Sequence, residues 1–129
     1  MAVIEKQTAR WQRNEAVDMV SGWLLNQRPI DAIAANNDEM AIGAIMALNQ
    51  AKNSRILVAG IDGTPDGQQF VKNGKMTLTI FQDAKGQAIG AVKVAKVLLD
   101  KQKVNEINLI PYKTITRDNY KEFATANAQ

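Results

Sequence analysis

Neither cysteine nor histidine occurs in the 129 residues of this sequence. Without cysteine there is no disulfide, thiol nucleophile or thiolate metal site, and without histidine the commonest general base and metal ligand are missing. Catalysis would have to depend on carboxylates, lysine, tyrosine or hydroxyl groups. The lack of cysteine fits an exported bacterial protein as well as a cytosolic one, so it does not decide the compartment.

Long apolar runs and basic clusters are also missing. No stretch of about 18 apolar residues occurs, so no membrane-spanning segment is predicted. The opening residues MAVIEKQTAR lack the apolar region of a signal peptide, which indicates an internal or engineered start. The net charge is +3, and no run of Lys and Arg is longer than two residues. A nucleic-acid partner is therefore not expected.

Composition and pattern indicate a globular α/β domain, or part of one. Apolar residues make up 46% of the chain and charged residues 22%, as in folded domains. Predicted strands and helices alternate, which indicates a mainly parallel sheet flanked by helices, with right-handed crossovers. The apolar run at 55–61 is uninterrupted, as expected for a strand that is covered on both faces. Strands are predicted at 3–4, 30–35, 55–61, 76–81 and 107–115, and helices at 13–27, 38–49, 68–72, 84–99 and 118–125.

Successive predicted strands end in an amide or a carboxylate. Asn36 and Asn37 come after one strand, and Asp62 and Gln82 come after the next two. In open α/β sheets, ligands bind beyond the carboxyl ends of the strands. The sequence therefore predicts that polar side chains gather on one rim of the sheet.

Two interpretations of the stretch NNDEM, residues 36–40, stay open. Asn37 or Asp38 can cap the following helix, and Asp38 and Glu39 complement the helix dipole. A cap needs only one of these side chains, so capping leaves the second asparagine unexplained. Asn37 is the candidate for ligand hydroxyls, whereas Asp38 and Glu39 are assigned to the start of the helix.

The segment GIDGTPDG, residues 60–67, is typical of a tight turn between a strand and a helix. Its glycine spacing matches neither a dinucleotide fingerprint nor a P-loop. A carboxylate directly after a buried strand is costly unless it is paired, so Asp62 is a candidate for binding vicinal hydroxyls. After the next strand, Asp83 can cap a helix, and Gln82 is either merely exposed or part of the rim.

The aromatic residues give a mixed signal. Trp11 precedes the first long helix and is either a staple or core residue or a flat wall that stacks on a sugar ring, whereas Tyr112 shows no signal above packing.

No catalytic constellation emerges, since Asp62 and Asp66 lie in one turn and no separated acid–base pair is present. Amides, one carboxylate and one aromatic ring form a polyol-binding set without a nucleophile or a base. The sequence therefore predicts a binding protein rather than an enzyme.

The motifs NNDEMAIGA, VAGIDGTPDG and TIFQDAKGQ, in this order, resemble the C-terminal part of periplasmic sugar-binding proteins of the ribose-binding type. The DAKGQ form, together with QTARWQRNEA, is nearest to the inositol- and related cyclitol-binding branch. The resemblance implies two α/β lobes that are joined by crossovers and close on a sugar or cyclitol. It also implies the solute-binding component of an ATP-driven importer in the periplasm, with a membrane permease as partner and without a cofactor or metal.

The resemblance also implies roles for individual residues. Trp11 matches the stacking aromatic residue of the C-terminal lobe, and Asn37 matches the ligand-binding asparagine of the NDEM motif. Asp62 matches the aspartate of the GxDGTPDG motif, and Gln82 matches the glutamine that ends the strand before the last crossover. Arg13 is a weaker candidate for ligand contact.

The sequence is much shorter than the chains of this family, which predicts a C-terminal fragment. Residues 1–82 would belong to the ligand-binding lobe, 83–106 to a crossover helix that packs on the missing N-terminal lobe, and 107–129 to a returning strand and tail. The crossover helix would expose its apolar stripe and pack on another copy of the chain. A fragment that buries half of its ligand is expected to bind it weakly or not at all.

The effector-binding domain of a lac-repressor-type regulator shares this fold and is the alternative function. That class carries an N-terminal helix-turn-helix, and the sequence contains none. The DEMAIGA and GTPDG motifs favour the importer class.

Overall fold

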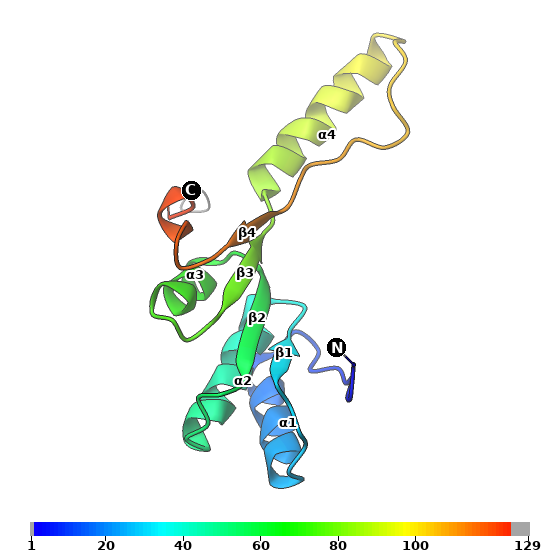
Figure 1. The fold of residues 1–129 in the computed structure, drawn as a ribbon. Helices are drawn as coiled ribbons and strands as arrows, with labels where there is room; N and C mark the ends of the chain where they lie inside the picture. The colour runs from blue at the N-terminus through cyan, green and yellow to red at the C-terminus, as the bar shows by residue number, and fades with distance from the viewer. Residues whose placement is uncertain (1, 125–129) are drawn as a thin grey trace.

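Within residues 2–124, which the computed structural model describes, a four-stranded sheet forms the centre of the molecule (Figure 1). The strands lie in the order of the sequence; the first three are parallel and the last is antiparallel to its neighbour. The α/β class and the mainly parallel sheet are therefore confirmed. The elements are α1 (Arg13–Leu25), β1 (Ala32–Ala34), α2 (Asp38–Gln50), β2 (Leu57–Asp62), α3 (Pro65–Lys72), β3 (Leu78–Phe81), α4 (Ala84–Leu99), β4 (Lys113–Ile115) and the 3₁₀ helix η1 (Tyr120–Glu122).

One helix begins earlier than its apolar pattern predicts. The helix predicted at 68–72 begins at Pro65, since Thr64 is its N-cap and accepts a hydrogen bond from the Gly67 N–H at 3.0 Å. Threonine caps well, and proline suits the first helical position because its missing N–H would have no partner there. The turn GIDGTPDG therefore ends inside a helix.

The predictions for both ends of the chain are partly wrong. The segment 3–4 belongs to no strand, although a short one is predicted there. Of the strand predicted at 107–115, only Lys113–Ile115 pairs with β3, because the preceding residues run beside α4, away from the sheet. The helix predicted at 118–125 is reduced to η1, and residue 125 lies outside the described residues.

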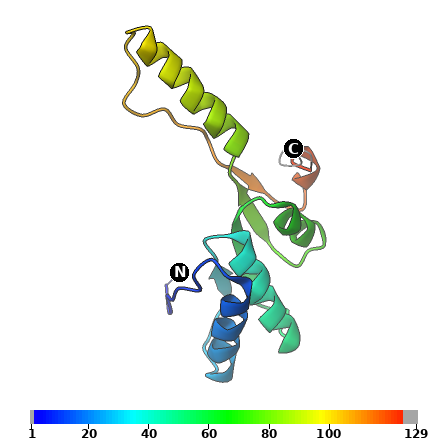
Figure 2. The same ribbon diagram turned by 180° about the vertical axis from the view of Figure 1, so that it is seen from behind.

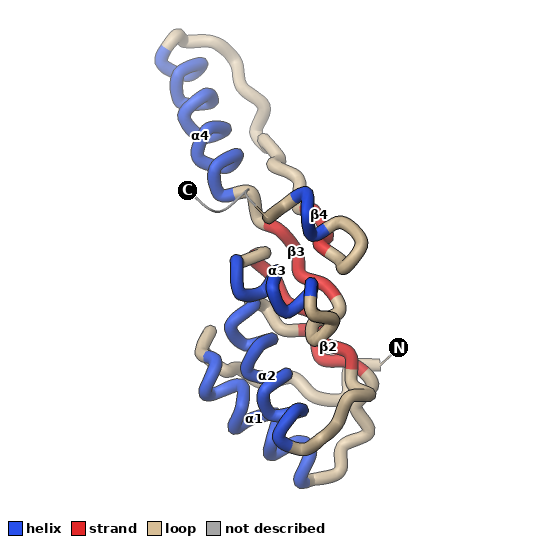
Figure 3. Tube along the Cα trace, turned by 90° about the vertical axis from the view of Figure 1, so that its left-hand side faces the viewer, coloured by secondary structure: helices blue, strands red, loops and turns tan. Residues whose placement is uncertain are grey.

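The sheet is covered on one face. Val58, Thr79 and Ile115, which share that face, are at most 2% exposed. Leu57 lies on the opposite face and is 57% exposed. The prediction that residues 55–61 are covered on both faces is therefore wrong, because α1 and α2 lie on the same side of β2 (Figure 3).

Helix α2 forms the middle of the core and lies close to α1. Its residues Ala41, Ile42 and Ala44 are at most 1% exposed. The approach of the two helices depends on Gly43, because a Cβ atom there would collide with the backbone of Arg13 at the start of α1. The N-terminal ends of α1 and α2 are therefore held together, next to the strand ends where a ligand site is predicted.

Helix α4 stands away from the rest of the molecule (Figures 1 and 2). None of its residues, all of which are described, is buried; Val92 is 70% exposed and Leu99 is 82% exposed. The prediction that its apolar stripe is exposed is therefore confirmed. An open groove of about 890 Å³ lies between α4 and the returning segment 105–110.

Candidate functional site

The polar residues at the ends of the parallel strands lie together. Asp62 is the last residue of β2, and Gln82 follows β3 directly. Nε2 of Gln82 donates a hydrogen bond to Oδ1 of Asp62 at 2.7 Å, and the backbone N–H of Asp38 also donates to the Asp62 carboxylate. Because Asn37 directly precedes Asp38, the predicted rim residues Asn37, Asp62 and Gln82 lie along one edge of the sheet.

Asn37 is the N-cap of α2. Its Oδ1 accepts a hydrogen bond from the Met40 N–H at 2.8 Å, and the residue is only 7% exposed. Its Nδ2 donates to the backbone oxygen of Trp11 at 3.4 Å. An amide nitrogen carries a second N–H, so capping is compatible with a bond to a ligand hydroxyl. The capping interpretation is confirmed, and ligand binding by Asn37 stays a prediction.

The two acidic residues after Asn37 do more than complement the dipole of α2. The carboxylate of Asp38 is fully buried and accepts hydrogen bonds from Thr64 and Thr79. Glu39 accepts hydrogen bonds from Arg13 of α1. Assigning both residues to the helix start is therefore incomplete, because each also ties α2 to other elements.

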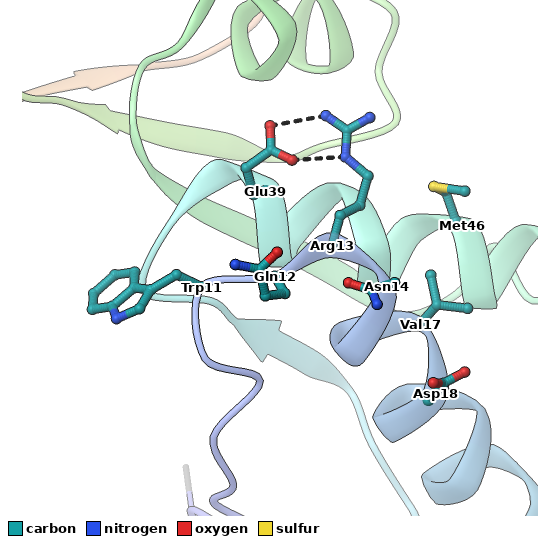
Figure 4. A pocket seen from close by; sticks show the side chains of 8 residues that line it. All are labelled: Trp11, Gln12, Arg13, Asn14, Val17, Asp18, Glu39 and Met46. Carbon is teal, nitrogen blue, oxygen red and sulfur yellow. Dashed lines mark hydrogen bonds and ion pairs between the residues drawn. The ribbon is translucent and has the colours of Figure 1, made fainter.

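Trp11 is 61% exposed, so the interpretation of this residue as a core aromatic is wrong. Arg10 and Trp11 both have a positive φ, 47° and 65°, which is uncommon for residues of this size. The indole ring points away from the pair formed by Arg13 and Glu39 (Figure 4). Since Asn37 bonds to the Trp11 backbone, the residue that carries this exposed ring lies beside the polar rim.

Arg13 joins the N-terminal ends of three helices. Its Nε and one terminal nitrogen each donate to the Glu39 carboxylate at 2.9 Å (Figure 4). The same terminal nitrogen donates to Asp66 of α3 at 3.2 Å. The bond to Glu39 is the main cause of the raised pKa of the Arg13 guanidinium. Arg13 and Glu39 also line an open groove of about 640 Å³ on the surface of α1 and α2.

Asp62 has an unusual backbone and a perturbed carboxyl group. Its φ is 114°, a region that side chains other than glycine rarely adopt. Burial raises the pKa of its carboxyl group above the ordinary value, while the hydrogen bonds from Gln82 and from the Asp38 N–H act in the opposite direction. Such strained residues cluster at ligand sites, where the surrounding structure fixes them.

The sequence interpretation misses three residues that support the rim. Thr64 and Thr79 donate to Asp38, and the hydroxyl of Tyr112 donates to Oε1 of Gln82 at 3.3 Å. Thr64 has a recognisable signal, because it stands before a proline at the start of a helix. Tyr112, interpreted as a packing residue, is 59% exposed. No local feature of the sequence distinguishes Thr79 or Tyr112 from ordinary packing residues.

This arrangement suits the binding of hydroxyl groups. A carboxylate accepts hydrogen bonds, amides donate and accept them, and an exposed indole offers a flat apolar face. Residues 2–124 contain no group of three or more side chains of the metal-binding types His, Cys, Asp and Glu that could hold a metal ion. No helix in this described part is long and apolar enough to cross a membrane.

Comparisons with known proteins agree with the fold and with this kind of site. The sequence profile of a family described as periplasmic binding protein domain matches residues 1–103. A putative rhizopine-binding protein of Rhizobium meliloti is 39% identical over 127 residues, which are 97% of this chain and 41% of the relative. The ribose import binding protein of Salmonella typhimurium is 37% identical over 102 residues, which are 79% of this chain and 34% of the relative.

A solved structure gives the same result. The solute-binding protein of an ABC transporter from Bacillus halodurans, with bound myo-inositol, superimposes with a TM-score of 0.86 and 41% sequence identity. The match covers 97% of this chain and 44% of that one. The chain therefore spans less than half the length of the relatives it matches, and all three relatives are named as binding proteins rather than enzymes.

Proposed function

This chain belongs to the family of the periplasmic binding protein domain, and from that premise we propose that it is part of the solute-binding component of an ATP-driven importer. Its ligand is a sugar or a cyclitol, which it binds without a chemical reaction. The observation that carries this proposal is the contact of the Gln82 amide with the Asp62 carboxylate at 2.7 Å, beside the capping amide of Asn37.

A cyclitol is the favoured ligand within this class. Myo-inositol is the molecule bound in the Bacillus halodurans relative. A cyclitol carries hydroxyls all around its ring, and a neighbouring pair of them suits the two oxygens of the Asp62 carboxylate. The ring face suits the exposed indole of Trp11. Import proteins among the relatives favour this function over that of a regulator's effector domain.

Arg13 belongs to the proposed ligand-binding residues and also has a structural role. Its guanidinium already bonds to Glu39 and Asp66. A guanidinium carries more N–H groups than these bonds use, so it has donor capacity for a ligand hydroxyl. We assign to Arg13 mainly the support of Trp11, which lies two positions before it.

The chain divides into three parts in this proposal. Residues 1–82 form part of the C-terminal ligand-binding lobe, 83–106 form a crossover helix that packs on an N-terminal lobe, and 107–129 form the returning strand and tail. The exposed apolar side chains of α4, such as Val92 and Leu99, support a packing partner for that helix. The intact protein works in the periplasm with a membrane permease.

In the absence of an N-terminal lobe, α4 packs on a second copy of the chain. The molar mass in solution tests this self-association, and Val92→Glu in the exposed stripe should return the chain to a monomer. A folded monomer of 14.2 kDa at all concentrations would count against it.

Calorimetric titration of the full-length protein tests the function. We expect saturable binding of myo-inositol or of a sugar such as D-ribose, with the ligand recovered unchanged. Asp62→Asn should weaken binding strongly, because it replaces one acceptor oxygen by a donor. The absence of binding for cyclitols and sugars alike, or consumption of the ligand, would reject the proposal.

A further inference from the structure

The carboxylate of Asp38 is buried directly behind the binding edge. The residue is 0% exposed and begins α2 directly after Asn37. A buried ionisable side chain is costly unless hydrogen bonds satisfy it. The Thr79 hydroxyl donates to its Oδ1 at 2.6 Å, and the backbone N–H and the hydroxyl of Thr64 donate to its Oδ2 at 2.7 and 2.9 Å. Both oxygens are therefore engaged, and they tie α2 to β3 and to the cap of α3.

The turn that Asp38 holds is the one that carries Asp62. Beyond its bond to Asp38, the Thr79 hydroxyl accepts a hydrogen bond from the Gly63 N–H at 3.2 Å. Gln68 donates to the Gly63 carbonyl oxygen at 2.8 Å. Consecutive peptide groups after Asp62 are thus held by buried side chains. Because φ of Asp62 is 114°, its backbone depends on such restraints to stay in this conformation.

The packing around Asp38 restricts its position as well. A Cβ atom on Gly60 of β2 or on Gly67 of α3 would collide with the Asp38 carboxylate oxygens. The carboxylate therefore fills space that these two glycines leave open, between the strand before the turn and the helix after it. Because the carboxylate is enclosed in this way, it cannot move without displacing β2 before the turn or α3 after it.

We propose that Asp38 is a positioning residue for the ligand site. Through Thr64 and Thr79 it fixes the turn at 62–64, so that the Asp62 carboxylate faces the ligand at the strand end. Asp38 is fully buried and acts through these neighbours rather than by touching the ligand. The inference rests on the proposed function, because it explains how Asp62 is aimed at a polyol.

Substitution of Thr79 in the full-length protein tests this role with the buried shape preserved. Thr79→Val removes the hydroxyl that bonds to Asp38 and Gly63, whereas Thr79→Ser keeps it. We expect the affinity for myo-inositol to fall about tenfold or more in Thr79→Val and to stay within about threefold in Thr79→Ser. Hydrogen exchange of the Gly63 and Thr64 amides should accelerate in Thr79→Val alone. Asp38→Asn should weaken affinity in the same way.

A destabilised control separates positioning from stability. Leu48→Ala removes a core side chain near the far end of α2 and should lower the melting temperature without changing affinity or the exchange of these amides. The inference fails if Thr79→Val binds like the wild type, or if Leu48→Ala loses as much affinity. A wild type that binds no cyclitol or sugar would refute the proposed function, while the exchange of the Gly63 and Thr64 amides would still decide whether the hydroxyl holds the turn.

Discussion

The side chain of Asn37 connects the start of α2 with the aromatic residue ahead of α1. Its Oδ1 caps the helix at Met40, and its Nδ2 donates to the backbone oxygen of Trp11 at 3.4 Å. One amide thus fixes a helix end and the segment that presents the exposed indole. Structure and binding overlap in Asn37, so substitutions have to be chosen that separate the two roles.

Asn37→Ser separates capping from binding. Serine caps a helix about as well as asparagine, so the free energy of unfolding should fall by no more than about 1 kcal/mol, the contribution of the lost hydrogen bond to the Trp11 backbone. Serine lacks the amide N–H groups, so the affinity of the full-length protein for myo-inositol should fall about tenfold or more. Asn37→Ala should show the same loss of affinity and also lose about 1 kcal/mol of stability beyond that of Asn37→Ser. Urea unfolding and calorimetry measure the two effects.

Capping would be the whole role of Asn37 if the affinity for myo-inositol stayed the same in both variants while only the stability of Asn37→Ala fell. In that case Asn37→Ser would bind like the wild type, and Asn37→Ala would melt earlier with its affinity retained.

The contact of Gln82 with Asp62 predicts a pH effect on ligand binding. The bond from Gln82 lowers the pKa of the Asp62 carboxyl group, which burial raises. Gln82→Leu should therefore raise this pKa further. If ionised Asp62 binds the ligand, affinity is lost as the pH falls through that pKa, and Gln82→Leu moves the loss to higher pH. Titrations with myo-inositol between about pH 4 and 7 measure the shift.

Tyr112→Phe is the matched control for this titration. It removes the bond to Oε1 of Gln82 and leaves the bond from Gln82 to Asp62 in place. The pH profile of Tyr112→Phe should stay close to that of the wild type. Identical profiles for all three proteins would mean that the bond from Gln82 to Asp62 does not set the pH at which ligand binding is lost.

Asp38 predicts how the stability of the chain depends on pH. Burial raises the pKa of its carboxyl group in the folded chain, the nearby charge of Asp62 acts in the same direction, and the bonds from Thr79 and Thr64 oppose them. Between the ordinary value of 3.8 and the raised folded pKa, the folded state binds more protons than the unfolded state. The contribution of Asp38 to stability is thus fully present below the ordinary value and is lost as the pH rises through the folded pKa.

Urea unfolding of the wild type and of Asp38→Asn measures this dependence. The decrease in stability from about pH 3 upward should be shallower in Asp38→Asn. It should not vanish, because the pKa of Asp62 is also raised and contributes with the same sign. Equal slopes in both proteins would mean that Asp38 titrates alike in the folded and unfolded states.

The sequence predicts the fold and the rim because their signals are local. Helix and strand periods, the cap at Asp83 and the polar strand ends at Asp62 and Gln82 can all be recognised within a few residues. The order of a parallel sheet then brings the strand ends together. All five candidate residues therefore come from motifs that are short in sequence. Four of them are connected by hydrogen bonds, with Asp38 linking Asn37 to Asp62; these are Trp11, Asn37, Asp62 and Gln82.

The support of the rim could not be predicted in this way, because it depends on contacts between distant residues. The partners of Asp38 lie 26 and 41 positions further along the chain, at Thr64 and Thr79. An aspartate at a helix start has a sufficient local explanation in the helix dipole, so its burial leaves no signal. The coverage of the sheet on one face could not be predicted for a similar reason. An apolar run such as the one around Leu57 does not indicate which face of the strand a helix covers.

A pair of glycine substitutions tests how closely α3 is fitted to the Asp38 carboxylate. Gly67→Ala places a methyl group against the carboxylate oxygens and should destabilise the chain by about 1–3 kcal/mol. Gly22→Ala lies inside α1 with no atom within 4 Å of the added Cβ, and should stabilise the chain by up to about 1 kcal/mol. Both changes replace a helical glycine by alanine, so thermal unfolding reports mainly the difference in packing. If Gly67→Ala stabilised the chain as Gly22→Ala does, the Asp38 carboxylate would have room to move, and it could not hold Asp62 in place.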